Sequence, residues 1–257
     1  MLFGHEDKVE LFTKLKNSGG LGHAYLFFGD KGIGKFTFAK MLGNFLERKE
    51  FGISKIPLID MMITEPGENG SIGIDEARAI KRFLFRKPFA SERRIAIIRG
   101  AGNLTNEAEG ALLKIVEEPP VSSLILFIAE NEHLLFPPLS SRLTKIYFRR
   151  FKKGEIEETL KSCYNIPEKE AKEIGERSFG SMERAISALQ KKKKKNENED
   201  LFEEILDLRN KGVKKNSGVL KELLKRQTLL RRFRLNANLQ SKAITYIKTH
   251  HGHTGKI

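Results

Sequence analysis

A glycine-rich loop between an apolar strand and a helix constrains this chain more than any other feature of its sequence. The strand pattern covers Ala24–Phe28, and residues 29–35 read Gly-Asp-Lys-Gly-Ile-Gly-Lys. Apolar residues then recur with helical spacing over 38–46. A strand, a G-x-x-x-x-G-K loop and a helix together predict a P-loop, whose backbone N–H groups surround phosphate oxygens at a helix N-terminus. The residues expected to contact a nucleotide are Gly29, Gly32, Gly34, Lys35 and Thr37.

The N-terminal region repeats this alternation of short apolar runs and helical stretches. Nearly continuous apolar strands that are separated by helices predict a parallel sheet with both faces covered. We therefore predict an α/β fold with a five-stranded parallel sheet within residues 1–150. Besides Ala24–Phe28, the expected strands are 58–63, 95–98, 124–129 and 145–148.

Two smaller segments follow the predicted sheet domain. Residues 151–190 have a helical pattern throughout, and Ile156, Leu160 and Cys163 fall on one apolar face. Residues 191–257 begin with five consecutive lysines, which predict a charged linker, and continue with further helical patterns. We expect a helical domain at 151–190 and a short helical segment at 191–257.

Basic residues are concentrated in the C-terminal segment. The chain holds 47 Lys and Arg against 33 Asp and Glu, a formal net charge of +14. Residues 191–257 hold 18 basic and 7 acidic residues, which leaves 29 and 26, a net of +3, for the first 190. This asymmetry favours an anionic partner, with nucleic acid first, and a solvated charged face is the alternative.

Membrane and secreted classes are not expected. The longest uninterrupted apolar run, Leu124–Ala129, is too short to span a bilayer, and no secretory signal opens the chain. Cys163 is the only cysteine, which excludes an internal disulfide and any zinc site built from several thiolates. We expect a cytoplasmic protein with no membrane partner.

The P-loop lacks the side chains that hold magnesium in a P-loop ATPase. Such enzymes have Ser or Thr directly after the lysine, where this chain has Phe36. Thr37 follows, but one helical step turns a side chain by about 100°. The Asp expected after a second strand is also missing, because 99–102 reads Arg-Gly-Ala-Gly. We expect no magnesium site and no intrinsic ATPase activity; ATP binding without hydrolysis stays open, as does a vestigial Lys35 satisfied by a strand-end carbonyl.

Four segments of the first 190 residues carry distinctive motifs. Gly-His-Ala-Tyr-Leu-Phe-Phe-Gly at 22–29 leads into the P-loop, and a helical pattern at 103–120 ends in Glu-Glu-Pro-Pro. Segment 134–143 contains Ser-Ser-Arg-Leu, and 180–185 reads Gly-Ser-Met-Glu-Arg-Ala. Together these segments resemble the bacterial clamp-loader subunits of DNA polymerase III, with Leu143 in the position of a usual cysteine.

The resemblance implies an AAA+ P-loop module with a helical lid at 151–190 and an oligomerising collar at 191–257. Many relatives carry a cysteine-rich zinc module after the P-loop helix, and 44–75 here holds no cysteine. The ATP-hydrolysing subunits keep both magnesium-binding elements, whereas delta-prime-type subunits commonly have degenerate ones, as here. The implied function is that of a non-hydrolysing delta-prime-type scaffold in the DNA polymerase III holoenzyme, with no required cofactor.

The resemblance also implies the partners and the roles of two arginines. The partners are gamma/tau-type and delta-type subunits in a hetero-oligomeric ring, the sliding clamp, and the phosphate backbone of primer-template DNA. Arg142 would enter a neighbouring subunit's site as an arginine finger; the alternative is a surface arginine paired with a local carboxylate. Arg184 would approach the phosphates of a nucleotide in its own subunit, or it would brace the lid against the core.

Two other functions stay open on the sequence. The first is an active ATPase with unusual metal ligation, such as the gamma/tau-like motor subunit of a clamp loader. The second is a basic nucleic-acid-binding protein that reuses an inactive P-loop core, which the charge of 191–257 motivates.

Overall fold

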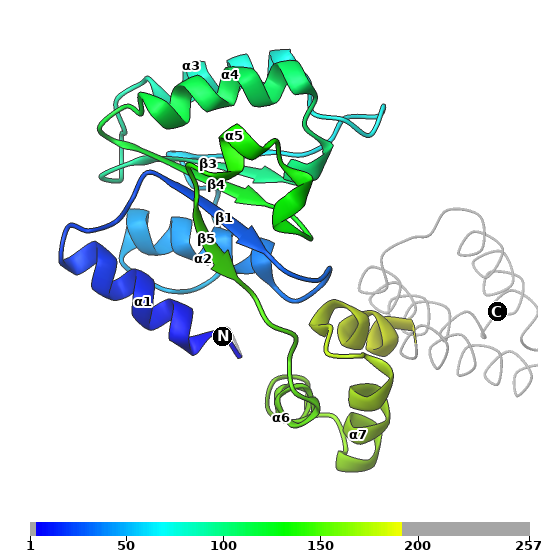
Figure 1. Ribbon diagram of the computed structural model, residues 1–257. Helices are drawn as coiled ribbons and strands as arrows, with labels where there is room; N and C mark the ends of the chain where they lie inside the picture. The colour runs from blue at the N-terminus through cyan, green and yellow to red at the C-terminus, as the bar shows by residue number, and fades with distance from the viewer. Residues whose placement is uncertain (1–3, 192–257) are drawn as a thin grey trace, which may run out of the picture. The chain divides into compact units, whose positions relative to one another are not determined.

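The computed structural model describes residues 4–191 (Figure 1). The chain divides into two compact units, Met1–Ala188 and Leu189–Ile257. The predicted collar at 191–257 lies outside the described residues except for Lys191. The fold described below is that of the first unit, which contains the sheet and the helices that follow it.

A five-stranded parallel sheet forms the centre of the first unit, as predicted. Its strands lie in the order β2-β3-β4-β1-β5, and every neighbouring pair is parallel. All six residues of β4 are buried, because β4 lies between two strands and beneath helices. The strands are β1 (Ala24–Phe28), β2 (Met61–Thr64), β3 (Arg94–Arg99), β4 (Ser123–Ile128) and β5 (Thr144–Tyr147).

Helices cover both faces of the sheet (Figure 1). On one face lie α3 (Ile74–Leu84) and α4 (Asn106–Glu117), and on the other lie α1 (Glu6–Asn17) and α2 (Lys35–Arg48). The short α5 (Pro137–Ser140) connects β4 to β5 after a 3₁₀ turn at Glu132–Leu134; a second such turn, Ala101–Asn103, follows β3. Thr105 caps α4 by accepting a hydrogen bond from the Ala108 backbone N–H at 3.3 Å.

The face beneath α1 and α2 is filled by aromatic rings. Phe27 of β1 lies 5.7 Å from the rings of both Phe12 and Phe38 and 5.2 Å from that of Phe148, measured between centroids. Tilted and edge-to-face geometries of this kind add to the hydrophobic gain of burial. Since Phe38 belongs to α2, this cluster fixes the helix that follows the P-loop against the sheet.

Two helices of the predicted lid, α6 (Lys153–Tyr164) and α7 (Glu168–Arg177), pack on each other, and residues 182–191 are also helical. Ile156 and Leu160 are fully buried, as their spacing predicts. The prediction for Cys163 is wrong, because this side chain is exposed. It lies in the last turn of α6, beyond the face that Ile156 and Leu160 bury. Within residues 4–191, none of the helices combines the length and hydrophobicity that crossing a membrane requires.

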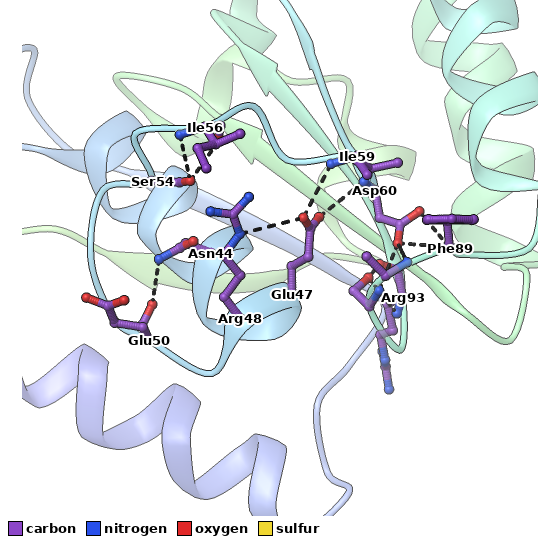
Figure 2. A network of polar contacts seen from close by, with 12 residues as sticks. Asn44, Glu47, Arg48, Glu50, Ser54, Ile56, Ile59, Asp60, Phe89 and Arg93 are labelled. Atoms are coloured by element: carbon purple, nitrogen blue, oxygen red, sulfur yellow. Dashed lines mark hydrogen bonds and ion pairs between the residues drawn. The ribbon is translucent and has the colours of Figure 1, made fainter.

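The segment between α2 and β2 is held by hydrogen bonds around Asp60 (Figure 2). The fully buried Asp60 carboxylate accepts backbone hydrogen bonds from Phe89, Ala90 and Ser91 at 2.6–2.9 Å. Glu47 of α2 in turn accepts from the Asp60 N–H at 3.2 Å. Because the N–H groups of Ile59 and Asp60 donate to Glu47, β2 begins at Met61, and the predicted strand at 58–63 starts three residues too early.

Burial alone would raise the pKa of Asp60, but the three backbone N–H groups and Arg94 outweigh it and hold that pKa below its usual value. A carboxyl whose pKa is lowered by folding stabilises the native state above its unfolded pKa, and this contribution is lost as the pH falls through the folded pKa.

We predict that Asp60→Ala lowers the free energy of unfolding by roughly 3 kcal/mol, because it leaves three backbone N–H groups and Arg94 without their buried acceptor. Urea denaturation at pH 7 measures this difference. The control is Asp75→Ala, which removes an exposed carboxylate paired with Arg78 and should change stability by about 0.5 kcal/mol or less. Equal stability of the two variants would show that the Asp60 network does not support the fold.

Candidate functional site

The glycines of the P-loop adopt backbone conformations that other residues avoid. Gly29, Gly32 and Gly34 have φ angles of 135°, 79° and 96°. A Cβ atom on Gly29 would lie 2.2 Å from the Phe148 carbonyl oxygen of the chain beside β5. Gly34 is the N-cap of α2, so the loop delivers the backbone directly into the helix N-terminus. The sequence pattern therefore folds into the strand, loop and helix that it predicts.

The Lys35 ammonium group forms its hydrogen bonds within its own loop. Its ammonium group donates to the carbonyl oxygens of Gly29 and Asp30, both at 2.5 Å, and the residue is only 6% exposed. Burial lowers the pKa of Lys35 to about 8, although Glu130, Asp30 and Glu183 act in the opposite direction. The Gly29 carbonyl is at the end of β1, which is the strand-end partner that the vestigial interpretation of Lys35 requires.

The two positions where magnesium ligands are expected contact each other. The Arg99 guanidinium at the end of β3 lies 4.7 Å from the centre of the Phe36 ring, and the Lys40 ammonium lies 4.8 Å from the same ring. Arg99 also forms an ion pair with Glu65 at 2.7 Å. A cation–π contact thus takes the place of two oxygen ligands, because positive charge binds the ring face where a metal would need oxygen. Thr37 is half-buried one residue further along α2.

The lid contacts the P-loop directly. The Gly32 carbonyl accepts hydrogen bonds from the Glu183 backbone N–H at 3.0 Å and from the Ser181 hydroxyl at 3.3 Å. Arg150, just before the lid, forms an ion pair with Asp30, and it is the main cause of the lowered pKa of that carboxyl. Arg184 is exposed, and its charge makes a smaller contribution to the same pKa. Hydrogen bonds and an ion pair therefore connect the P-loop to the predicted lid and to the residue just before it.

Arg142 lies elsewhere, just after α5. Its guanidinium forms an ion pair with Glu117 at the end of α4, at 2.9 Å, and donates to the Pro138 carbonyl at 2.8 Å. Both side chains are partly accessible, 44% for Arg142 and 40% for Glu117. The local carboxylate that the alternative interpretation requires is thus present. An accessible pair of this kind contributes only about 0–1 kcal/mol, so another anion can replace Glu117.

His5 contacts the P-loop, and the sequence analysis did not identify it. The side chain is completely buried, with Nε2 at 2.8 Å from the Ile33 carbonyl oxygen and the ring against Phe148 and Phe151. Its Nδ1 atom is buried without a hydrogen-bond partner. Burial lowers the pKa of His5, which favours the neutral ring. A single histidine before a helix has no periodic pattern, so the sequence offers no signal for this contact.

We predict that the free energy of unfolding falls as the pH drops below about 6.5, because the unfolded chain then protonates His5 more readily than the native one does. Replacing the ring by His5→Phe should reduce this fall, which urea denaturation at pH 5–7 measures. The control is His133→Gln, which replaces an exposed histidine and leaves the His5 ring in place, so this variant should keep the fall. An unaltered pH profile in His5→Phe would show that His5 is not the responsible group.

The chain shares sequence with known replication proteins. It is 30% identical over 161 residues to the DNA polymerase III subunit gamma/tau of Mycobacterium tuberculosis, a match that covers 57% of this chain and 28% of the relative. It is 29% identical over 197 residues to the replication factor C subunit 3 of Blastobotrys adeninivorans, covering 73% of this chain and 55% of the relative. The chain thus spans between a quarter and just over half of these relatives.

The fold matches that of a solved AAA+ protein, the RuvB Holliday junction branch migration motor of Thermotoga maritima. The TM-score is 0.53 at 18% identity, and the match covers 89% of this chain and 70% of the other. At this identity the likeness concerns the fold alone. Residues 4–152, more than half of the chain, match the family described as DNA polymerase III, delta subunit. The sheet, the P-loop and these matches together show that the chain belongs to this family of AAA+ clamp-loader proteins.

Proposed function

We propose that this chain is a non-hydrolysing, delta-prime-type subunit of a clamp loader that acts in DNA replication. The observation that carries this proposal is the contact between Phe36 and Arg99 where an ATPase places its magnesium ligands. Phosphoryl transfer depends mainly on metal and positioning, and neither the Phe36 ring nor the Arg99 guanidinium provides an oxygen ligand for the metal. The chain would then support hydrolysis by a neighbouring subunit.

ATP is not a required ligand in this proposal. A nucleotide in the P-loop would have to take the Lys35 ammonium away from the Gly29 and Asp30 carbonyls, to which it is bound at 2.5 Å. It would also face a lid that is hydrogen-bonded to Gly32. We propose that any nucleotide binds weakly and without magnesium through Gly29, Gly32, Gly34, Lys35 and Thr37, while Arg184 braces the lid.

Arg142 is the residue that we propose to act in trans. Its guanidinium is held in place by Glu117 and the Pro138 carbonyl, yet almost half of the side chain is accessible. The γ-phosphate of ATP in a neighbouring subunit carries more negative charge than Glu117 and competes for the same donors. Arginine binds such phosphates through two parallel N–H groups and stabilises the charge that develops during transfer.

The proposed partners follow from the family. The relatives that match are named as subunits of DNA polymerase III and of replication factor C. We propose that this chain joins gamma/tau-type and delta-type subunits in a hetero-oligomeric ring in the cytoplasm, and that the ring meets the sliding clamp and primer-template DNA. The proposed collar at 191–257 lies outside the described residues.

A second candidate is the ATP-hydrolysing motor subunit. It is favoured by the 30% identity to gamma/tau subunits, and the absence of an acid after β3 speaks against it. The third function that the sequence left open is a nucleic-acid-binding protein with an inactive P-loop core. None of the relatives reported above is named as a protein of that kind.

We predict that the purified chain turns over ATP at well below about 1 s⁻¹ with or without magnesium, the lower end of the usual enzyme range. A steady-state phosphate-release assay measures the rate. The variant Lys35→Ala is the control for a contaminating ATPase, because a contaminant would keep its activity in that preparation. Magnesium-dependent turnover above about 1 s⁻¹ that Lys35→Ala abolishes would favour the motor subunit.

We predict that Arg142→Ala lowers ATP turnover at the neighbouring site by about 10³-fold or more in a ring reconstituted with motor subunits, clamp and primed DNA. Arg142→Lys should restore little, because lysine lacks the two parallel donors. Arg177→Ala is the matched control, since Arg177 is another accessible arginine in an ion pair, with Glu173. Unchanged hydrolysis in an assembled ring that contains Arg142→Ala would contradict the role of Arg142.

A further inference from the structure

Two phenylalanines at the end of α3 and in the loop that follows are exposed among basic side chains. Phe85 is 58% exposed and Phe89 is 81% exposed. Residues 78–94 contain seven Lys and Arg and a single acidic residue, Glu92. We call the exposed basic and aromatic residues between positions 81 and 89 the basic aromatic strip; they are Lys81, Arg82, Phe85, Arg86, Lys87 and Phe89.

The way in which α3 packs on the sheet explains this exposure. Ala77, Ile80 and Leu84 are fully buried and fix the helix against the sheet. Lys81 and Phe85 are four residues apart on another face of the helix, and the Lys81 ammonium lies 5.6 Å from the centre of the Phe85 ring. The aromatic ring and the cations therefore share a face that the packing of α3 does not use.

The loop beyond α3 is anchored although the Phe89 ring is exposed (Figure 2). The Phe89 N–H donates to the buried Asp60 carboxylate at 2.9 Å, and the next two N–H groups donate to the same carboxylate. On the other side of the loop, the Arg94 guanidinium donates to the Lys87 carbonyl at 3.0 Å. The backbone is thus fixed on both sides of Lys87 and Phe89, so it loses little conformational freedom when a ligand binds.

The chemistry of the strip matches single-stranded nucleic acid. Closely spaced cations neutralise successive phosphates, and exposed aromatic rings stack on unpaired bases. Duplex DNA would use the cations but not the rings, because its bases are already stacked. An acidic protein surface would use the cations as well, but it has no need of two flat rings between them. We propose that the basic aromatic strip binds a single-stranded nucleic acid, at a site that is separate from the P-loop and independent of ATP.

Fluorescence anisotropy with the full chain tests this proposal. The probes are a labelled 20-nucleotide oligothymidine and a labelled duplex of the same length, at about 100 mM salt. We expect Phe85→Ala/Phe89→Ala to weaken oligothymidine binding about fivefold or more and duplex binding much less. Arg86→Ala/Lys87→Ala should weaken binding of both probes and reduce the salt dependence for oligothymidine, by about 0.7 per lost phosphate contact.

The matched control is Lys161→Ala/Lys169→Ala, which removes two exposed charges from α6 and α7 and should leave oligothymidine binding nearly unchanged. Thermal unfolding of each variant checks that the fold is intact, which is expected because the strip residues are exposed. Equal affinity of wild type and both strip variants for oligothymidine would overturn the proposal. So would equal loss in the control variant, or a phenylalanine effect of the same size on duplex DNA, since no stacking would then be involved. These outcomes leave the proposed role of Arg142 untouched, because neither probe reports ATP turnover.

Discussion

The contact between the Arg99 guanidinium and the Phe36 ring determines what the P-loop edge of the sheet can do. In a parallel sheet the carboxyl ends of the strands lie along one edge, and only β4 separates β1 from β3. The residue after the P-loop lysine and the residue at the end of β3 are therefore brought into contact. In a magnesium-dependent ATPase these two positions share one metal ion. Here they share a cation–π contact, and Glu65 neutralises the cation. The two replacements fit each other sterically and electrically, so neither leaves an unpaired charge beside the loop.

The rest of the loop is held from three directions. The Lys35 ammonium bonds to the carbonyl oxygens of Gly29 and Asp30 within the loop. The His5 ring, which precedes α1, contacts the Ile33 carbonyl oxygen. The predicted lid donates a hydrogen bond to the Gly32 carbonyl oxygen. All of these contacts are made to backbone carbonyl oxygens of the loop. They therefore depend on the backbone conformation of the loop and not on its side chains. The loop can therefore keep its conformation without a nucleotide, as the proposed non-hydrolysing role requires.

The features that could be predicted from the sequence are those with a periodic apolar pattern or with glycines in a special backbone conformation. Five apolar strands and the glycines of the P-loop follow from local chemistry, and the structure contains them. The sequence could not predict contacts between distant residues of different types. Asp60 binds backbone N–H groups about thirty positions away, and His5 binds a carbonyl 28 positions away, so no local pattern marks either one. For the same reason the start of β2 and the exposure of Cys163 were misjudged, because each depends on what packs nearby.

In the proposed ring, the ion pair between Arg142 and Glu117 would affect how the subunits associate and separate. An arginine that is already paired is not left without a counter-ion when its neighbour departs, so separation exposes no isolated charge. Glu117 ends α4 directly before Glu-Pro-Pro, a segment whose prolines restrict backbone movement, so the carboxylate stays at a fixed place to receive the guanidinium again. Exchange of Glu117 for an anion of another subunit would then cost little free energy, as an interface that forms and separates repeatedly in the proposed ring requires.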